Sequence, residues 1–381
     1  MLLDRATGER RELAAAASGA DFVAGRIVYA DPKGQLYALP FDLETLKALG
    51  PATPLTERVH VPTVGQAMFS AASSGAIAFL PALEGASLES GRSLVWVDRQ
   101  GREEPIAAPP RAYAVARLSP DGTRIALDVR DEGNDIWIWS LDRGVLTRLT
   151  STPTLDMAPV WTPDGRRIIW TTTRDDTSPT LYWQAADGSG SAERVGGPAI
   201  AFPGSVTPDG QAVLSTSGGA VFIRTSLVGE RSSARLLGPM QALFAPELSP
   251  DGRWLAYQSN ESGLPEVYVR PYPNVDAGRW QISTQRGSRP AWSRNGRELF
   301  FLDGSDRLSV ATIAVNGSTL VPGVPRRLLD TAYYQGFTTR GAYLRGYDVS
   351  PDGQRFLMIK GTADAAASQT VMTVVSNWPQ R

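Results

Sequence analysis

The segment Leu118-Ser119-Pro120-Asp121-Gly122 recurs along the chain, and a short apolar run follows each copy. In the first copy this run is Arg124-Ile125-Ala126-Leu127. The other copies are Trp161-Thr162-Pro163-Asp164-Gly165, Val206-Thr207-Pro208-Asp209-Gly210, Leu248-Ser249-Pro250-Asp251-Gly252, the degenerate Trp292-Ser293-Arg294-Asn295-Gly296, and Val349-Ser350-Pro351-Asp352-Gly353. Regular self-similarity of this kind decides the architecture before any single residue is considered.

The period of the repeat predicts the fold class. The turn glycines follow one another every 42 to 45 residues from Gly122 to Gly296, and Gly353 comes 57 residues later. A period of about 40–45 residues is typical of four-stranded propeller blades. The apolar residues alternate or form short blocks rich in Val, Ile, Trp and Tyr, which favours strands. The sequence therefore predicts an all-β protein, a β-propeller of four-stranded antiparallel blades.

The repeated turn has a mechanical interpretation. Proline presets φ for a tight turn, and glycine supplies the left-handed conformation that closes a hairpin. Each copy is thus expected to link the innermost strand of a blade to the second strand. Because the turn aspartates fall one to a blade, we expect them to lie on a ring and stabilise turns, not to gather into a metal site.

Two weaker copies, around Gly25 and Gly75, raise the expected blade number to eight, with seven as the alternative. We expect a single domain over residues 1–381. Its approximate repeats are 20–60, 66–108, 112–151, 156–196, 200–238, 243–284, 288–330 and 343–378. The last repeat lacks a fourth strand, so residues 1–14 are expected to complete the last blade and close the ring, which removes an exposed sheet edge. Alternatively, the chain is cut from a longer protein.

The composition of the chain limits the kinds of partner and site that we expect. The net charge is −1 and the charges are scattered, which argues against a nucleic-acid surface. The absence of cysteine excludes disulfides and thiolate metal sites. No apolar run is long enough to span a membrane, and the N-terminus lacks the pattern of a signal peptide. We expect a monomer without cofactor or metal.

Catalytic signatures are scarce in the sequence. His60 is the single histidine, and no Gly-x-Ser-x-Gly elbow, Walker loop or dinucleotide fingerprint occurs. We therefore expect no catalytic residues. An alternative is a propeller-type lyase or glycosidase that uses two carboxylates in the channel.

Longer strings carry a resemblance to a known family. They are Leu94-Val95-Trp96-Val97-Asp98-Arg99-Gln100-Gly101, Asn134-Asp135-Ile136-Trp137, Ser259 to Pro271, and Trp292 to Phe300. The chain resembles the WD40-like propellers of bacterial TolB-type proteins, and most closely the propeller region C-terminal to bacterial serine/threonine kinase domains. The resemblance implies an extracytoplasmic or periplasmic sensing or scaffolding propeller, or an accessory domain of a larger kinase or peptidase. The kinase elements themselves are missing here.

The expected function is non-catalytic binding of a protein, peptide or small ligand at one mouth of the central channel. Propellers bind through the loops at their ring faces, with rigid blades behind them. Polar residues that lead into the inner strands are the candidates for the rim: Asp156, Arg289, Arg345 and Asp348.

Overall fold

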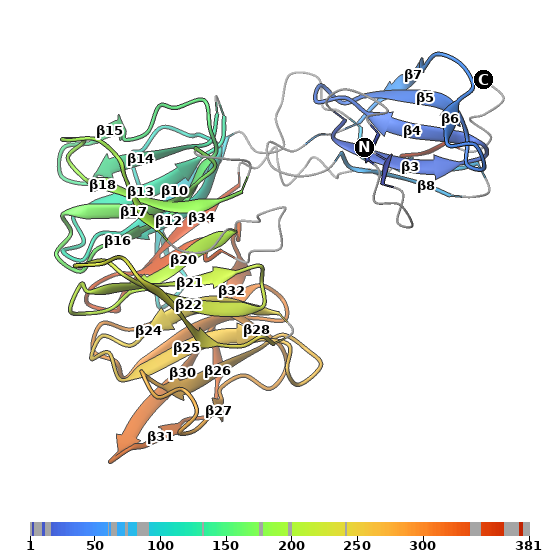
Figure 1. Ribbon diagram of the computed structural model, residues 1–381. Helices are drawn as coiled ribbons and strands as arrows, with labels where there is room; N and C mark the ends of the chain where they lie inside the picture. Colours follow the sequence, from blue (N-terminus) through green and yellow to red (C-terminus); the bar gives the residue numbers. More distant parts are fainter. Residues whose placement is uncertain are drawn as a thin grey trace. The chain divides into compact units, whose positions relative to one another are not determined.

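The computed structural model divides the chain into two compact units. It describes residues 2–3, 10–11, 17–59, 61, 67–72, 75–81, 91–131, 133–174, 178–196, 200–240, 242–335, 344–361 and 373–375. Unit 1 combines residues 1–88 with 364–381, and unit 2 consists of residues 89–363. The described residues form strands, turns and loops (Figure 1). They include no helix that is long and apolar enough to cross a membrane.

Unit 2 contains six antiparallel sheets among its described residues, and five of them follow the sequence repeats in chain order. The strands of these five sheets are β12 (Tyr113–Leu118), β13 (Arg124–Val129), β14 (Asp135–Ser140) and β15 (Val145–Arg148); β16 (Asp156–Trp161), β17 (Arg167–Thr172), β18 (Thr180–Ala185) and β19 (Glu193–Gly196); β20 (Ala201–Val206), β21 (Ala212–Ser217), β22 (Val221–Ser226) and β23 (Ser233–Leu237); β24 (Leu243–Leu248), β25 (Trp254–Ser259), β26 (Glu266–Pro271) and β27 (Trp280–Gln281); and β28 (Gly287–Trp292), β29 (Glu298–Asp303), β30 (Arg307–Asn316), β31 (Thr319–Pro322) and β32 (Arg326–Ala332).

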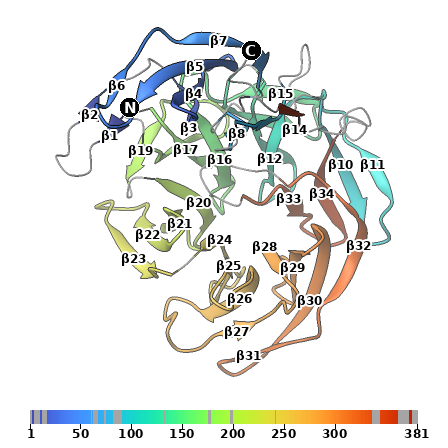
Figure 2. The same ribbon diagram turned by 90° about the vertical axis from the view of Figure 1, so that its right-hand side faces the viewer.

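The sixth sheet joins the two ends of unit 2. Its strands β33 (Tyr347–Val349) and β34 (Arg355–Lys360) pair with β10 (Ser93–Asp98) and β11 (Glu103–Pro105) from the beginning of the unit. The first strands of the six sheets, β12, β16, β20, β24, β28 and β33, neighbour one another in turn, and β33 contacts β12 (Figure 2). Unit 2 is therefore a closed ring of six blades, a β-propeller.

The repeated turn is held by one hydroxyl group. Ser119 Oγ donates to Asp121 Oδ1 at 2.5 Å and accepts a bond from the backbone N–H of Arg124 at 2.9 Å. The same pair of bonds recurs in the other five copies, at Thr162, Thr207, Ser249, Ser293 and Ser350. The six turn glycines have φ between 66° and 73°, a region that favours glycine. Each turn is thus closed by its own side chains.

The acidic residue of the turn serves as an acceptor. In the degenerate copy, Asn295 Oδ1 accepts from Ser293 Oγ at 2.8 Å and from the backbone N–H of Arg297 at 2.9 Å, so an amide oxygen does the same work. The hydroxyl donor, with nearby backbone N–H groups, lowers the pKa of four turn aspartates: Asp121, Asp164, Asp209 and Asp352. These carboxylates bond to their own turns, as the sequence predicts.

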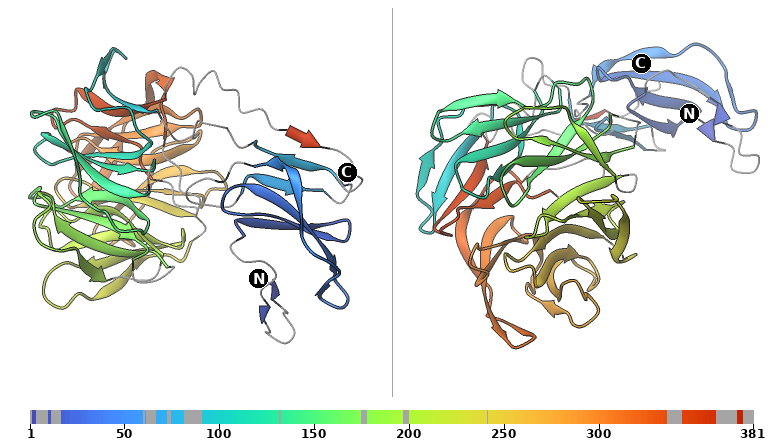
Figure 3. Two further views of the ribbon diagram at one scale, coloured as in Figure 1. Left: turned by 90° about the horizontal axis from the view of Figure 1, so that it is seen from above. Right: turned by 60° about the vertical axis from the view of Figure 1, so that its left-hand side comes forward.

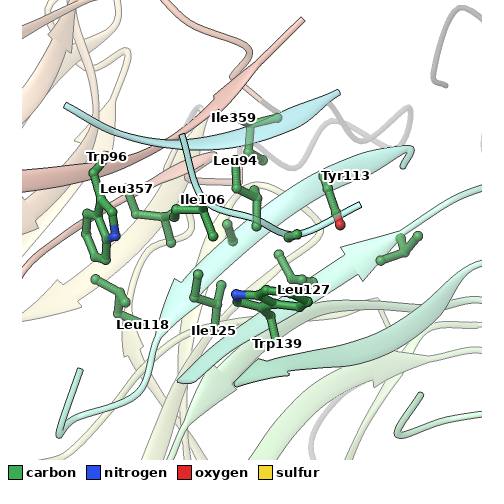
Figure 4. Close-up of a cluster of buried hydrophobic side chains, with 13 residues drawn as sticks. Leu94, Trp96, Ile106, Tyr113, Leu118, Ile125, Leu127, Trp139, Leu357 and Ile359 are labelled. Carbon is green, nitrogen blue, oxygen red and sulfur yellow. The ribbon is translucent and has the colours of Figure 1, made fainter. Parts of the chain in front are cut away.

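Apolar side chains packed between neighbouring sheets hold the blades together. In the cluster of Figure 4, Leu94 and Leu357 of the closing sheet pack with Ile125, Leu127 and Trp139 of the next sheet. Each of these side chains is at most 4% exposed. Burial of one such aliphatic side chain contributes about 1.5–3 kcal/mol. The contact that closes the ring is therefore stabilised by a buried apolar core.

Unit 1 is built from both ends of the chain. A five-stranded sheet and a three-stranded sheet share a core that includes Val28, Leu36 and Phe79. In the three-stranded sheet, the C-terminal strand pairs with the second repeat, from Thr373 opposite Phe79 to Val375 opposite Ile77 (Figure 3). The strands of unit 1 are β1 (Leu2–Leu3) and β2 (Arg10–Arg11), which pair with each other; β3 (Gly19–Val23), β4 (Arg26–Ala30), β5 (Gln35–Asp42), β6 (Lys47–Ala48) and β7 (Thr53–Arg58); and β8 (Phe69–Ala71), β9 (Ile77–Phe79) and β35 (Thr373–Val375).

The expected all-β propeller of four-stranded blades is confirmed, but the single eight- or seven-bladed ring is not. The eight repeats correspond to eight sheets of three or more strands, of which six lie in unit 2 and two in unit 1. β10 and β11 supply the outer strands of the last blade, and most of residues 1–14 lie outside the described residues; those described, Leu2–Leu3 and Arg10–Arg11, pair with each other. The second and last repeats have exchanged outer strands. Repeats with near-identical apolar patterns specify an inner strand and a turn, but do not specify which outer strand will pair with them.

The turn hydroxyl yields a matched pair of substitutions. Ser350→Ala removes the acceptor for the backbone N–H of Arg355, and we expect it to lower the free energy of unfolding by about 1–3 kcal/mol. Ser350→Thr is expected to cost much less, because Thr162 and Thr207 already occupy the equivalent position. Urea unfolding of both variants checks this. Equal losses would contradict the assigned role of the hydroxyl.

The turn aspartates predict a specific acid sensitivity. A carboxyl whose pKa is lower in the folded chain stabilises the fold above its unfolded pKa of about 3.9, and this contribution disappears as the pH falls through the folded pKa. The combined replacement of Asp121, Asp164, Asp209 and Asp352 by asparagine keeps an acceptor oxygen, as at Asn295. We expect the variant to lose less stability than the wild type between about pH 5 and pH 2. Thermal melts across this range measure the melting temperature of both proteins at each pH. Equal losses in the variant and the wild type would refute the predicted role of the aspartates.

The closing sheet can be tested by cross-linking. Ser93 lies opposite Lys360 in the pairing of β10 with β34. Since the sequence has no cysteine, Ser93→Cys with Lys360→Cys introduces one defined pair. Partners directly across an antiparallel pair are about 4.5–5.5 Å apart at Cα, within reach of a disulfide. We expect mild oxidation to give a faster-migrating band on a non-reducing gel. The two single-cysteine variants are the control, and a double variant that behaves like them would exclude this closure.

Candidate binding site in the channel of unit 2

One position of the repeat supplies most of its side chains to the channel at the centre of the ring. It lies two residues before the turn Ser or Thr, and its six occupants are Arg117, Val160, Ser205, Glu247, Ala291 and Asp348. All of these except Ala291 line a cavity of about 360 Å³ that opens on the side of the turns. Inner strands that meet around an axis bring equivalent positions together, so residues far apart in sequence share one channel.

The rim of this cavity, which we call the channel mouth, is made by the turns themselves. The prolines Pro120, Pro163, Pro208 and Pro250 line it. In the degenerate copy the proline position is taken by Arg294, which is exposed and also lines the mouth. Within the described part of the chain, Arg294 has no carboxylate partner. The turns therefore contribute to the mouth through their second residue and not through their aspartates.

Deeper in the channel, the wall is apolar and bulged. The residues before three prolines have positive φ, namely Ala158 (57°), Ala245 (51°) and Arg289 (53°). At these points the inner strands slip in register against their neighbours. Phe202, Phe244 and Leu344 line this deeper part. A bulge bends a strand and redirects its side chains, which here turns the proline rings toward the channel.

Four charged side chains form the floor of the mouth. Arg345 donates to Glu247 Oε1 at 3.0 Å and to Asp348 Oδ1 at 3.2 Å. Arg117 lies 3.7 Å from Glu247 Oε2 and donates to the carbonyl oxygen of Gly204 at 2.9 Å. The other oxygen of Asp348 accepts the backbone N–H of Leu118 at 2.8 Å. Glu247 is thus paired from across the channel, and Asp348 is paired within its own segment and with the adjacent strand β12.

The two arginines of the floor differ in their electrostatics. Burial, together with the charge of Arg345, lowers the pKa of Arg117. Burial also acts to lower the pKa of Arg345, but the charges of Glu247 and Asp348 outweigh it and raise that pKa. Arg345 is therefore the more closely paired of the two with the acids, whereas burial dominates at Arg117. Two buried donor atoms, Arg117 Nη1 and Arg345 Nε, have no hydrogen-bond partner among the described residues.

The rim residues expected from the sequence fall into two groups. Arg345 and Asp348 line the mouth together. Asp156 is fully buried at the start of β16, where it accepts a bond from Trp170 Nε1 at 3.0 Å and where burial raises its pKa. Arg289 is 3% exposed and donates to the carbonyl oxygen of Leu344 at 2.7 Å, which holds the backbone just before Arg345. Asp156 and Arg289 lie outside the lining of the mouth.

Sequence reasoning missed Arg117 and Glu247, although the repeat carried a signal for them. Both lie two residues before the turn Ser, as Asp348 does. Alignment of the six copies on the turn would have identified this position as the one that faces the channel. His60 lies outside the described residues. In the part that the structure describes, no three His, Asp or Glu side chains gather in a group that could hold a metal ion.

Comparisons with known proteins agree with this architecture. Residues 82–239 match the family described as the TolB beta propeller domain. The Tol-Pal system protein TolB of Anaeromyxobacter dehalogenans is 42% identical over 81 residues, which cover 20% of this chain and 18% of the relative. An uncharacterized protein of Agrobacterium fabrum is 31% identical over 155 residues, 36% of this chain and 52% of the relative. The chain thus spans about a fifth to a half of the length of these curated relatives.

A solved structure supports the same assignment of fold. It is a TolB candidate from Agrobacterium tumefaciens that superposes with a TM-score of 0.57 at 17% identity, covering 71% of this chain and 98% of that structure. At this level of identity the likeness concerns the fold alone. The six closed blades of unit 2 are thus a β-propeller fold, and residues 82–239 are similar to the TolB beta propeller domain family.

Proposed function

We propose that this chain is a non-catalytic binding protein that engages a segment of a protein partner at the channel mouth of unit 2. The observation that carries the proposal is the mouth itself, an open cavity of about 360 Å³ with proline walls and a charged floor. Concave sites with apolar walls and a few fixed polar groups are the usual form of binding pockets. The volume is at the small end of that class, which suits one or two side chains of a larger partner.

The relatives support a protein partner. Those at 42% identity are named Tol-Pal system protein TolB, a name that assigns them to a multi-protein system. A scaffold role is the corresponding proposal for this chain. Rigid blades favour it, because a site fixed by six sheets loses little conformational entropy when a partner binds.

The channel carboxylates favour binding over glycoside hydrolysis. Glu247 and Asp348 are the two carboxylates of the channel floor, and both contact the guanidinium of Arg345. Glycosidases need one carboxyl group that delivers a proton to the leaving oxygen. Here both groups accept bonds from Arg345 and neighbouring donors, so they act as counter-ions for arginine. The geometry therefore supports recognition better than acid catalysis.

Blocking the mouth tests the proposed function. Pro250→Trp adds bulk at the rim in a turn position where Arg294 is already tolerated. Arg166→Trp adds the same bulk at an exposed turn residue outside the lining and is the matched control. We expect the affinity of Pro250→Trp for an array of random octapeptides to fall at least tenfold, which is about 1.4 kcal/mol of binding free energy. The affinity of Arg166→Trp should stay unchanged.

Two outcomes would contradict a peptide-binding mouth. One is that the wild-type chain binds no member of the array. The other is that both tryptophan variants bind as the wild type does. Circular dichroism melts of the variants identify any loss that comes from unfolding.

A further inference from the structure

The channel mouth has donors that the chain itself does not use. Arg345 is 7% exposed at its side chain, and its Nε atom has no hydrogen-bond partner among the described residues. The same holds for Nη1 of Arg117, whose side chain is 11% exposed. A buried donor left without a partner costs about 1–3 kcal/mol. Both arginines line the cavity of the mouth, where a ligand would meet their side chains.

The acids of the floor are not available to serve these donors. Glu247 is shared between Arg345 and Arg117, and Asp348 is taken by Arg345 and the backbone N–H of Leu118. A ligand that brings an acceptor to this floor would complete the site.

The charge at the mouth determines which sign of charge the ligand carries. The charged residues that line the cavity are three arginines and two acids: Arg117, Arg294, Arg345, Glu247 and Asp348. Arg294 stands at the rim where four other turns carry proline, so the excess positive charge lies at the entrance. A charge on low-dielectric walls attracts the opposite charge more strongly than it would in open water.

We propose that the channel mouth binds its peptide partner through a carboxylate, which is seated against Arg117 and Arg345 and guided past Arg294 at the rim. This inference rests on the proposed function and specifies the chemistry of the partner. A carboxylate offers two acceptor oxygens to guanidinium donors, and charge-assisted bonds of this kind are the stronger class of hydrogen bond. The turn prolines, together with Trp161 and Trp292, supply apolar walls for the peptide residues next to the carboxylate.

Trp161 and Trp292 add rigidity to the floor. Trp161 Nε1 donates to the carbonyl oxygen of Arg117 at 2.9 Å, and Trp292 Nε1 donates to that of Glu247 at 3.2 Å. Each indole thereby ties a channel residue to the next blade. The arginine and its acid are presented from a fixed backbone, which favours a ligand group of defined geometry.

The test uses octapeptide pairs that differ at one position, glutamate in one member and glutamine in the other. We expect the full chain to bind the glutamate members about tenfold more tightly, and 0.5 M salt to reduce this preference. Arg117→Gln should reduce the preference to less than threefold while leaving the Arg345–Glu247 bond in place. Arg117→Lys, which keeps the charge, should retain part of it. Arg166→Gln removes an equal charge from an exposed turn and should leave the preference unchanged.

The outcomes separate this inference from the proposed function. Peptides that bind and are blocked by Pro250→Trp, but show no preference for glutamate, overturn the carboxylate site and leave peptide binding intact. A preference that survives Arg117→Gln also overturns the assignment. If no peptide binds, both proposals fail. Thermal melts of each arginine variant establish that the ring is folded under the conditions of the binding measurement.

Discussion

The six-bladed ring depends on a hydrogen bond from a Ser or Thr hydroxyl to the acid or amide two residues later, made once in every blade. This bond, with the backbone N–H that the same hydroxyl accepts, fixes the turn between the first and second strands. This turn also sets the register of the inner strand. A register shift of one residue would reverse which side chains face the channel. Arg117, Glu247 and Asp348 meet at the axis because their turns are closed identically.

Much of the fold could be predicted from the sequence, because it depends on local chemistry. Glycine at positive φ, proline before it and a small hydroxyl residue at the start define a hairpin without reference to distant residues. Strand exchange between the second and last repeats could not be predicted. Leu94 and Leu357 are buried apolar residues in strands that resemble the equivalent strands of every other blade, so local sequence gives no preference for one partner.

The site was predictable in part for a related reason. Arg345 and Asp348 lie near the start of an inner strand, where a polar residue is easily noticed beside the apolar residues of the strand. Asp156 and Arg289 share that feature, yet Asp156 satisfies Trp170 and Arg289 holds the carbonyl of Leu344. A polar residue at a strand entrance is therefore ambiguous between structural and ligand-facing roles. The repeat position is the better guide, because in five of the six copies the residue two before the turn Ser or Thr lines the channel cavity.

The pairing of β35 with β9 makes unit 2 an insertion within unit 1. Strands on either side of unit 2 in the sequence must meet, so the three-stranded sheet of unit 1 cannot be completed until β35 has been synthesised. Such non-local pairing is slow, because a long loop must close before any contact rewards it. The six-bladed ring also closes by a non-local pairing, of β10 with β34, and its strands are complete once residue 360 is made. During synthesis all strands of the six-bladed ring are therefore made before β35, on which the three-stranded sheet of unit 1 depends.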